Sequence, residues 1–385
     1  MTRPVRVVPA RAATVPALLD ALAAALDGTG PAVLPVDDGP GTGVEAGGAV
    51  PDEVALLVRT SGSTGTPREV MLSAAALTAS ARATYQRLSG PGAWLLPLPP
   101  AHVAGLQVLV RSLVAGTVPE VLDGPFRPDA FAAATARLDA AGLPRYTSLV
   151  PTQVHRLLDD PAGRAALAAY DAVLLGGAAA PPALVARARD TGARVVTTYG
   201  MSETSGGCVY DGVPLDGVTA DLDADGRIRL AGPVLATGYR DRPDLDSDLF
   251  TTEGGTRWLR TSDLGRWVDG RLEVLGRADD VLVTGGEKVA PAAVERVLAG
   301  RPGVGEVLVV GVPDPEWGQA LVAVVVPGTA AAPDLGDLRD AAATALGRAA
   351  APRHLVTVDA LPLRGPGKPD RSGAATLAAR ALGRD

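Results

Sequence analysis

Apolar runs and helical patterns alternate over residues 54–200 of this chain. Apolar runs of strand length lie near residues 54–60, 93–98, 117–122, 146–150, 171–176 and 193–199. Between them, apolar residues recur at helical spacing near residues 73–88, 103–115, 128–140, 151–158 and 181–190. Such alternation is typical of parallel strands joined by crossover helices. The pattern predicts an α/β fold with parallel-rich sheets in this part of the chain.

The rest of the chain shows other patterns. Residues 14–26 predict a helix capped by Gly28, whereas the Gly-, Pro- and Asp-rich residues 27–52 are typical of loop. From about 205 to 275, short apolar runs separated by turn residues predict a compact β subdomain.

A smaller α+β unit is predicted after Gly276. It has apolar runs at 281–283, 307–312 and 321–326 and helical patterns near 290–299 and 335–348. Residues from Ser372 favour a final helix. We therefore expect two domains, residues 1–276 and residues 277–385, with their boundary near 277–280.

Composition excludes several classes of protein. The 385 residues are 47% hydrophobic and 21% charged, with a net charge of -7, so no basic surface for nucleic acid is expected. No apolar run reaches the length of about 18 residues that a membrane span needs. No signal peptide is evident, and Cys208 is the single cysteine, so we expect a cytoplasmic protein without disulfides.

Lysine is rare in this chain. Of the 36 cationic residues, only Lys288 and Lys368 are lysine, and the others are arginine. Arginine does not replace lysine where a compact charge on a thin stem is required. Both lysines are therefore candidate functional residues, although survival at two exposed positions by chance is the alternative.

A hydroxyl-rich segment follows the first apolar run of the α/β region. Its donors and small residues suit a polyphosphate, which needs many hydrogen bonds and little steric bulk. It lacks the Gly-Lys-Ser/Thr ending of a Walker loop, so taken alone it is equally consistent with a polar surface loop. The candidate ligands are Thr60, Ser61, Gly62, Ser63, Thr64, Gly65, Thr66 and Arg68.

Four further motifs follow this segment in order. They are Tyr-Gly-Met-Ser-Glu-Thr at 199–204, Thr-Ser-Asp-Leu-Gly at 261–265, Gly-Arg-Ala-Asp-Asp at 276–280 and Gly-Pro-Gly-Lys at 365–368. Together with the 60–68 segment they resemble the adenylate-forming superfamily of acyl-CoA ligases, adenylation domains and luciferases. The resemblance covers about residues 54–372. It implies an enzyme that joins a carboxylic acid to ATP as an acyl-adenylate and then transfers the acyl group to a thiol.

The resemblance assigns roles to the nucleotide-binding residues. The 60–68 segment would hold the β- and γ-phosphates, with Arg68 where the family usually has lysine, and Glu203 would bind Mg²⁺. Tyr199 would stack on adenine, and Asp263 would accept two hydrogen bonds from the ribose diol. The further ATP contacts implied are Gly176, Gly177, Ala178, Gly200, Ser202, Thr204 and Arg277.

The resemblance also assigns roles around the domain boundary. Lys368 would bridge the substrate carboxylate and the α-phosphate, so it is the main catalytic candidate, and Glu203 and His102 are the others. Asp279 would lie at the hinge about which the small domain turns. Gly285, Gly286 and Lys288 would line the path of CoA.

The acid pocket is expected on the helix that follows His102. His102 would border the acyl group, and Arg111 is a charge within an apolar helix, which must be paired or reach water. The functional interpretation is that Arg111 meets a second carboxylate on the substrate; the alternative is an arginine extending to the surface. With Gly200 and Ser202, this pattern resembles the o-succinylbenzoate–CoA ligases of menaquinone biosynthesis, whose substrate is an aromatic dicarboxylic acid.

The implied ligands are therefore ATP, Mg²⁺, coenzyme A and an aromatic dicarboxylic acid, and a homodimer is left open. Three alternatives remain at this point. They are a ligase for another aryl or short acyl acid, a free-standing adenylation module that loads a carrier protein, and a sensor that binds acyl-adenylate without catalysis.

Overall fold

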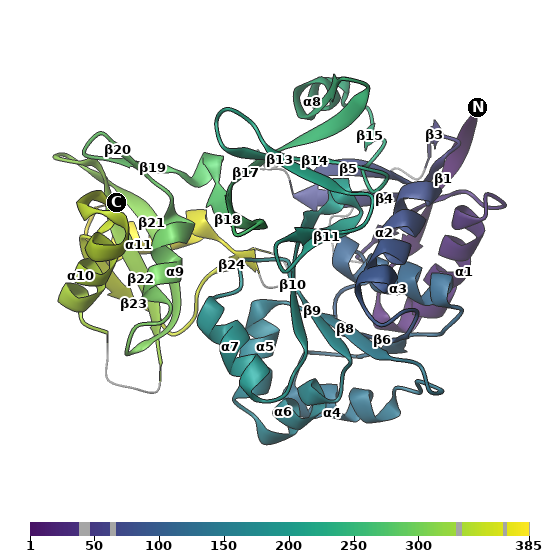
Figure 1. The fold of residues 1–385 in the computed structure, drawn as a ribbon, viewed down its shortest axis with the longest axis horizontal. Helices are drawn as coiled ribbons and strands as arrows, with labels where there is room; N and C mark the ends of the chain where they lie inside the picture. Colours follow the sequence, from purple (N-terminus) through teal and green to yellow (C-terminus); the bar gives the residue numbers. More distant parts are fainter. Residues whose placement is uncertain (38–46, 62–66, 329–332, 365–367, 385) are drawn as a thin grey trace.

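The computed structural model describes residues 1–37, 47–61, 67–328, 333–364 and 368–384 (Figure 1). We call the elements from β1 to β18 the body and the elements from β19 to α11 the C-terminal lobe. The two groups lie on opposite sides of the view in Figure 1. The fold is α/β, as predicted, and none of the described helices is long and apolar enough to cross a membrane.

The first sheet of the body has the strand order β15-β5-β4-β2-β1-β3. Strands β1, β2 and β4 are parallel, and the outer pairs are antiparallel. The strands are β1 Thr2–Pro9, β2 Ala32–Val36, β3 Ala49–Pro51, β4 Val54–Ser61, β5 Pro67–Ser73 and β15 Gly238–Tyr239.

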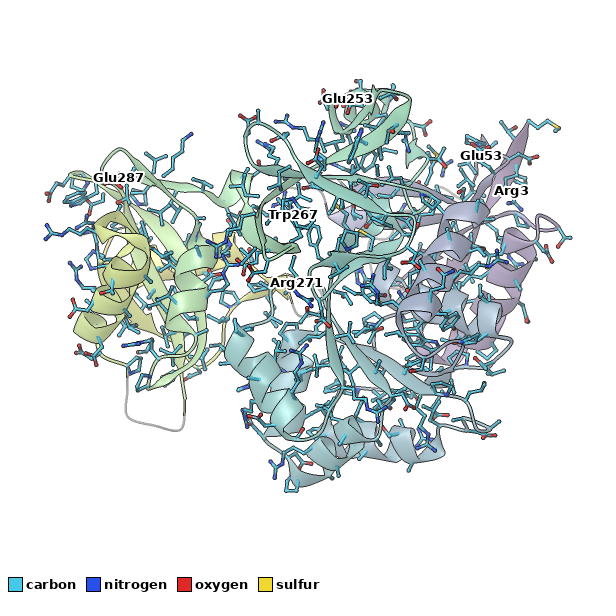
Figure 2. All side chains as sticks on the ribbon, in the orientation of Figure 1. Arg3, Glu53, Glu253, Trp267, Arg271 and Glu287 are labelled. Carbon is cyan, nitrogen blue, oxygen red and sulfur yellow. The ribbon has the colours of Figure 1, made fainter. Side chains whose placement is uncertain are left out.

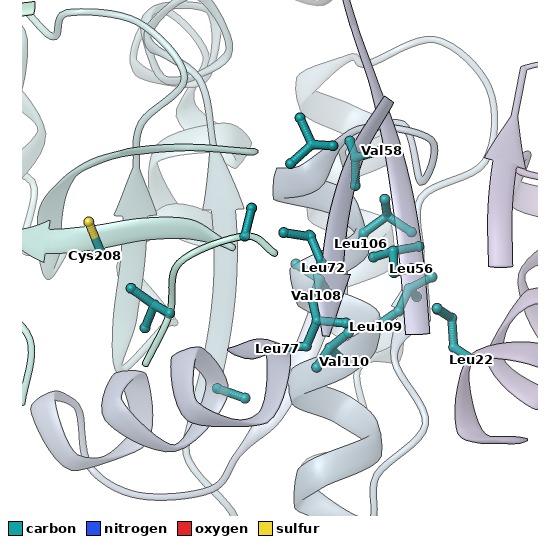
Figure 3. Packing of buried hydrophobic residues seen from close by; sticks show 14 of the residues in the cluster. Leu22, Leu56, Val58, Leu72, Leu77, Leu106, Val108, Leu109, Val110 and Cys208 are labelled. Atoms are coloured by element: carbon teal, nitrogen blue, oxygen red, sulfur yellow. The ribbon is translucent and has the colours of Figure 1, made fainter. Parts of the chain in front are cut away.

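Helices α1 (Val15–Leu26), α2 (Ala74–Arg87) and α3 (Val103–Ala115) share one hydrophobic core with this sheet. Figure 3 shows leucines from α1, β4, β5 and α3 meeting in it. Each such leucine contributes about 1.5–3 kcal/mol by leaving water. Because Ser73 caps α2 by accepting a hydrogen bond from the Ala76 N–H, strand β5 passes directly into the helix.

The second sheet has the order β12-β11-β10-β9-β8-β6-β7, and its strands from β6 to β10 are parallel. Alternate residues of these strands enter two different cores, one shared with α2 and α3 and the other with α4 to α7. Helices therefore cover both faces, which explains the nearly continuous apolar runs in the sequence. The elements are β6 Ala93–Leu96, β7 Glu120–Val121, β8 Arg145–Leu149, β9 Ala172–Leu175, β10 Val195–Met201, β11 Gly206–Tyr210, β12 Val213–Pro214, α4 Pro128–Arg137, α5 Pro151–Leu158, α6 Pro161–Ala168 and α7 Pro182–Asp190.

A third, antiparallel sheet forms the predicted β subdomain. Its order is β13-β14-β17-β16, and β18 pairs with the second half of β17. The elements are β13 Thr219–Leu222, β14 Arg227–Ala231, β16 Phe250–Glu253, β17 Thr256–Val268, β18 Arg271–Arg277 and the helix α8 Pro243–Leu249.

The C-terminal lobe is the predicted smaller α+β unit. Its sheet has the order β20-β19-β22-β21, with β23 beside β22; α9 and α10 pack on one face and α11 on the other. A short hairpin, β24 with β25, precedes α11. The elements are β19 Leu282–Thr284, β20 Glu287–Val289, β21 Val304–Asp314, β22 Gly318–Pro327, β23 His354–Thr357, β24 Leu363–Arg364, β25 Lys368–Pro369, α9 Pro291–Leu298, α10 Leu335–Leu346 and α11 Arg371–Ala381.

The prediction of loop over residues 27–52 was wrong in part. Residues 32–36 form the fully buried strand β2, and residues 49–51 form β3. The strand β1, the strand β5 and the short helices α6 and α8 were not predicted. Prolines within β1 and β2 conceal the strand pattern, because proline is usually depleted in strands. It cannot donate a backbone hydrogen bond, and only pairing with distant residues compensates for that loss.

Candidate active site

Several of the predicted nucleotide-binding residues lie at the carboxyl end of β10. Here the chain bends through Tyr199, Gly200 and Met201 into a turn of 3-10 helix at Ser202–Thr204, and then returns as β11. A side chain at Gly200 would overlap the Gly206 carbonyl and lie 2.7 Å from the Gly207 Cα. Glycine is thus required where the two strands approach most closely.

Glu203 is fixed by two other segments of the body. The Tyr239 hydroxyl donates a hydrogen bond of 2.6 Å to Glu203 Oε1, and the Ala236 N–H donates to the Glu203 carbonyl at 2.8 Å. Burial and the nearby Glu203 carboxylate raise the pKa of Tyr239, while the charge of Arg68 opposes this shift. The tyrosine therefore stays protonated and remains a donor at neutral pH. Arg68, Tyr239 and Glu203 form one electrostatic cluster.

Within this cluster, the Glu203 carboxylate is the one group that could bind Mg²⁺. Mg²⁺ is usually held by one or two carboxylates and completed by substrate phosphates and water, rather than by a cage of protein ligands. The described residues contain no group of three or more His, Cys, Asp or Glu suited to a metal. A single oriented carboxylate at Glu203 fits a metal that arrives with phosphates.

Thr204 and Ser202 occupy buried positions in the same turn. The Thr204 side chain is fully buried; its hydroxyl accepts from the Met201 N–H at 2.9 Å and lies 2.7 Å from the Gly206 carbonyl, to which it donates. Ser202 is 8% exposed. In this structure the Thr204 hydroxyl holds the turn, and that hydrogen bonding positions Glu203.

Tyr199 and Asp263 are joined although they are far apart in sequence. The Tyr199 hydroxyl donates a hydrogen bond of 2.8 Å to Asp263 Oδ2, and the Asp263 N–H donates to Thr261 Oγ1 at 3.1 Å. Asp263 also pairs in register with Arg277 across β17 and β18. The predicted adenine and ribose residues therefore lie together.

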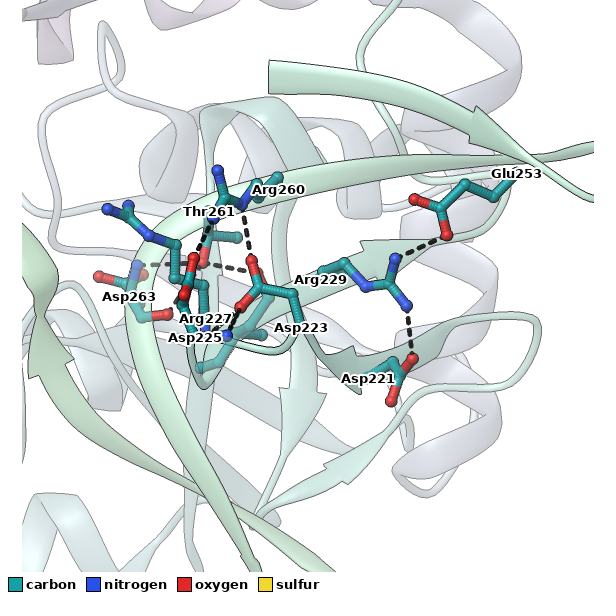
Figure 4. A network of polar contacts seen from close by, with 10 residues as sticks. Asp221, Asp223, Asp225, Arg227, Arg229, Glu253, Arg260, Thr261 and Asp263 are labelled. Atoms are coloured by element: carbon teal, nitrogen blue, oxygen red, sulfur yellow. Dashed lines mark hydrogen bonds and ion pairs between the residues drawn. The ribbon is translucent and has the colours of Figure 1, made fainter. Parts of the chain in front are cut away.

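An arginine and aspartate network supports the strand that carries Asp263. Figure 4 shows Arg260 bonded to Asp223 and Asp225, and Arg229 bonded to Asp221 and Glu253. The shortest of these contacts, from Arg260 Nε to Asp223 Oδ2, is 2.6 Å. The Arg260 pairs join β17 to the turn before β14, and the Arg229 pairs join β14 to β13 and to β16. They thereby support the strand that carries Thr261 and Asp263.

Gly176, Gly177 and Ala178 follow β9, the parallel neighbour of β10. A side chain at Gly176 would overlap the Thr198 hydroxyl, and Gly177 has a φ of +79°. The segment consequently passes close to β10 at Thr198, the residue before Tyr199.

The acid-pocket candidates lie on α3. His102 is the residue before the helix, and Val103, Gln107 and Arg111 share one helical face at successive spacings of four. Gln107 Nε2 donates to the Ser205 carbonyl at 2.6 Å, and its side chain would contact any Cβ at Gly206. This face of α3 therefore packs against the turn that follows Glu203.

Arg111 is buried in an aromatic environment, with 3% of its surface exposed. Its Nη2 donates to the Tyr210 hydroxyl at 3.3 Å, and its Cζ lies 5.1 Å from the centroid of the Trp94 ring. Among the described residues no carboxylate pairs with it, and its buried Nε has no hydrogen-bond partner. The alternative of an arginine extending to the surface is wrong, and Arg111 is an interior cation.

The phosphate-loop prediction falls partly outside the described residues. Gly62, Ser63, Thr64, Gly65 and Thr66 lie there, between the ends of the β4–β5 hairpin. At its base Thr60 pairs with Arg68, whose buried Nε has no partner among the described residues. Strand β5, which follows the loop, pairs with β15, the strand of Tyr239.

The two lysines lie on opposite sides of the C-terminal lobe. Lys368 pairs through its backbone with Arg364 in the β24–β25 hairpin, on the side of the lobe that faces the body in Figure 1. Lys288 is exposed in the β19–β20 hairpin, next to Glu287, which Figure 2 shows at the outer edge of the lobe. Gly285 and Gly286 turn that hairpin with φ of +58° and +82°.

The joint between body and lobe contains an exposed ion pair. Arg277 Nη2 lies 3.0 Å from Asp279 Oδ2, and both side chains are about half exposed, at 48% and 52%. An exposed pair of this kind contributes little to stability, so it does not by itself fix the joint.

Comparison with known families decides what this arrangement is. Residues 10–239 match the family described as AMP-binding enzyme, and residues 293–368 match its C-terminal domain. The chain belongs to the AMP-binding enzyme family.

Relatives of this AMP-binding enzyme are similar over nearly its whole length. A probable 2-succinylbenzoate–CoA ligase of Mycobacterium tuberculosis is 48% identical over 374 residues, which are 95% of this chain and 96% of the relative. The amide bond synthetase McbA of Marinactinospora thermotolerans superposes with a TM-score of 0.78 at 26% identity, covering 98% of this chain and 90% of its own. The o-succinylbenzoate CoA synthetase of Bacillus subtilis, in complex with the acyl-adenylate intermediate, has a TM-score of 0.73 at 25% identity, covering 96% and 87%.

Sequence reasoning missed several residues that organise the site of this AMP-binding enzyme. Tyr239, Tyr210 and Trp94 contact predicted site residues directly, and Gln107 donates to the Ser205 carbonyl in the turn that follows Glu203. The spacing of four from Val103 through Gln107 to Arg111 was available in the sequence and indicates one helical face. Nothing local indicates Tyr239, because its partner Glu203 lies 36 residues earlier.

Replacing Asp263 by Asn is expected to stabilise this AMP-binding enzyme while weakening its nucleotide binding. Burial raises the pKa of Asp263, although the Tyr199 hydrogen bond and the charge of Arg277 oppose the shift. Folding therefore disfavours the charged form, so the carboxylate lowers stability above its unfolded pKa, and this penalty disappears in acid.

Thermal unfolding at pH 7 and at pH 4 tests this prediction. Asp263→Asn should raise Tm at pH 7 and lose that advantage as the pH approaches 4, and the KM for ATP should rise. An Asn variant that is less stable than wild type at pH 7 would contradict the inference that burial disfavours the charged Asp263 carboxylate.

Proposed function

We propose that this AMP-binding enzyme is an AMP-forming acid–CoA ligase that converts 2-succinylbenzoate to 2-succinylbenzoyl-CoA in menaquinone biosynthesis. The near full-length similarity to a probable 2-succinylbenzoate–CoA ligase supports the activity. The observation that carries the choice of acid is Arg111, an interior cation on the helix face that packs against β11. A buried charge is costly unless it is paired, and a second substrate carboxylate supplies that pair.

The first step joins the acid to ATP. An oxygen of the substrate carboxylate attacks the α-phosphorus, the bond from that phosphorus to the bridging oxygen breaks, and pyrophosphate leaves. Arg68 and the 60–68 loop bind the leaving phosphates, Asp263 and Tyr199 orient the nucleoside, and Lys368 neutralises charge developing on the α-phosphate. Glu203, held by Tyr239, would be the protein ligand for Mg²⁺, which would neutralise charge on the phosphates.

The second step transfers the acyl group to CoA. The thiol sulfur, whose proton is lost to water, attacks the acyl carbonyl; the bond from that carbon to the phosphate oxygen breaks, and AMP leaves with both electrons of that bond. We assign residues 1–276 to the ATP- and acid-binding domain and residues 277–385 to a mobile lid with its hinge near 277–280. Turning this lid brings Gly285, Gly286 and Lys288 toward the site in place of Lys368. Since ATP and CoA are its substrates, we propose that the enzyme works in the cytoplasm.

A panel of acids tests the substrate. With ATP, Mg²⁺ and CoA, 2-succinylbenzoate should give AMP and thioester in equal amounts and faster than benzoate or short acyl acids. Carrier protein and simple amines offered in place of CoA separate the ligase from an adenylation module and from amide synthesis. Pyrophosphate release without any acyl acceptance would contradict ligase activity.

Replacing Arg111 by Leu is expected to lower kcat/KM for 2-succinylbenzoate by about 10- to 100-fold, the effect of losing one charged hydrogen bond. The matched substrate is 3-benzoylpropionate, which is the same acid without the carboxylate on its ring. Turnover of that acid should change little in Arg111→Leu, because it presents nothing for Arg111 to pair with. Equal losses for both acids would show that Arg111 has a structural role and does not select the dicarboxylate.

A further inference from the structure

Arg371 joins four separate elements through one partly buried guanidinium group. It is the first residue of α11, three positions after Lys368. Its Nη1 and Nη2 lie 2.5 Å and 3.0 Å from the two carboxylate oxygens of Glu295 on α9. Its Nε donates to Asp280 Oδ2 at 3.0 Å, and its Nη1 also donates to the Val309 carbonyl of β21 at 2.8 Å.

The partners of Arg371 are themselves held in place. Glu295 Oε1 also accepts a 2.7 Å hydrogen bond from the Val309 N–H. Asp280 ends the 3-10 turn Ala278–Asp280, which directly follows β18 of the body. The neighbouring Arg296 donates to the Val274 carbonyl of β18 at 2.7 Å, so this part of α9 contacts the body.

The β24–β25 hairpin starts and ends beside this group. The Asp370 N–H donates to the Pro362 carbonyl at 2.8 Å, which closes the base of the hairpin one residue before Arg371. Lys368 lies on the returning strand, between that closure and Arg364. The backbone of Lys368 is therefore two residues from a closed hairpin base and three residues from a guanidinium bonded to the joint.

We propose that Arg371 is a positioning residue that couples the Lys368 hairpin to the hinge at Asp280. This inference rests on the proposed function, in which Lys368 acts only in acyl-adenylate formation. A fork-shaped pair with Glu295 fixes the orientation of the guanidinium in its plane, and the Nε bond to Asp280 then fixes the hinge relative to the hairpin. Rotation at the hinge consequently carries Lys368 to one defined place.

The coupling has a kinetic consequence that a general structural role lacks. A displacement of about 1 Å at a reacting group costs on the order of 10²-fold in rate. Losing the hydrogen bonds of Arg371 to Glu295 and Asp280 should therefore slow adenylation by up to that factor. Thioester formation from added acyl-adenylate does not use Lys368, so its rate should be nearly unchanged. Simple unfolding of the lobe would slow both steps together.

The experiment measures the two half-reactions separately in the full-length enzyme. Arg371→Lys keeps the charge and loses the fork; Asp280→Asn keeps the fork and weakens the hinge bond. Both should lower kcat for pyrophosphate release with little change in the KM for ATP, and added guanidinium ion should partly restore Arg371→Ala. Arg384→Gln is the matched control, since Arg384 bonds Asp314 at 2.6 Å near the other end of α11.

The outcomes separate this inference from the proposed function. Selective loss of adenylation in Arg371→Lys and Asp280→Asn, with Arg384→Gln like wild type, supports the coupling. Equal loss in both half-reactions, or an effect of Arg384→Gln as large as that of Arg371→Lys, overturns it. If Lys368→Ala loses adenylation but Arg371→Lys does not, the coupling fails while the ligase function stands. If wild type does not adenylate 2-succinylbenzoate, the function itself fails.

Discussion

Replacing Lys368 by Ala is expected to slow acyl-adenylate formation by on the order of 10²–10³-fold, the usual effect of removing one preorganised donor from a developing charge. The carboxylate and the α-phosphate are both anionic, so the attack needs a cation between them. Thioester formation from supplied acyl-adenylate should continue, because the α-phosphate is then the leaving group of a finished intermediate. Pyrophosphate release and thioester yield, measured separately, check the prediction.

Lys288→Ala is the matched control, because Lys288 is the only other lysine in the chain. It should leave adenylation intact and raise the KM for CoA. If Lys368→Ala formed acyl-adenylate at the rate of wild type, the catalytic role given to the hairpin lysine would be wrong.

Replacing Gly200 by Ala is expected to disable both substrate sites at once. The new methyl group would overlap the Gly206 carbonyl, where neither backbone has room to move. Overpacking of this kind costs about 1–3 kcal/mol. The pairing of β10 with β11 also positions Glu203 and the Ser205 carbonyl, which accepts a hydrogen bond from Gln107. The variant should therefore have a lower affinity both for ATP and for the acid.

Gly300→Ala provides the comparison for that variant. A side chain at Gly300 would meet nothing within 4 Å, so its Tm and activity should match wild type. Calorimetry with nucleotide and acid titrations measures both effects. A Gly200→Ala variant with unchanged affinity for ATP and acid would show that the β10–β11 closure does not shape the site.

The α/β architecture could be predicted because parallel strands buried on both faces give unbroken apolar runs. Strands β6, β8, β9 and β10 and the helices between them follow that rule. By contrast, β2 contains Pro35 within a buried strand, and only its pairing with Val8 of β1 shows what it is. Local patterns carry no information on such long-range pairing.

Candidate site residues could be named one by one from the motifs, but the contacts that join them in the structure could not. Tyr199 and Asp263 were chosen as two separate nucleotide contacts, yet they also bond each other across 64 residues. Glu203 was predicted as a metal ligand, while the tyrosine that aims it comes from a two-residue strand with no pattern of its own. Motifs identify the groups that meet a substrate, whereas the groups that hold them depend on tertiary packing.

The placement of Lys368 and Lys288 on opposite sides of one lobe has a consequence for the order of events. In the hinge motion that we propose, turning the lobe presents one of the two hairpins to the body at a time, so the two half-reactions follow one another. The acyl-adenylate is then complete before the thiol is admitted, and each catalytic cycle contains two reorientations of the lobe. Solvent viscosity should accordingly limit overall turnover more than it limits either chemical step alone.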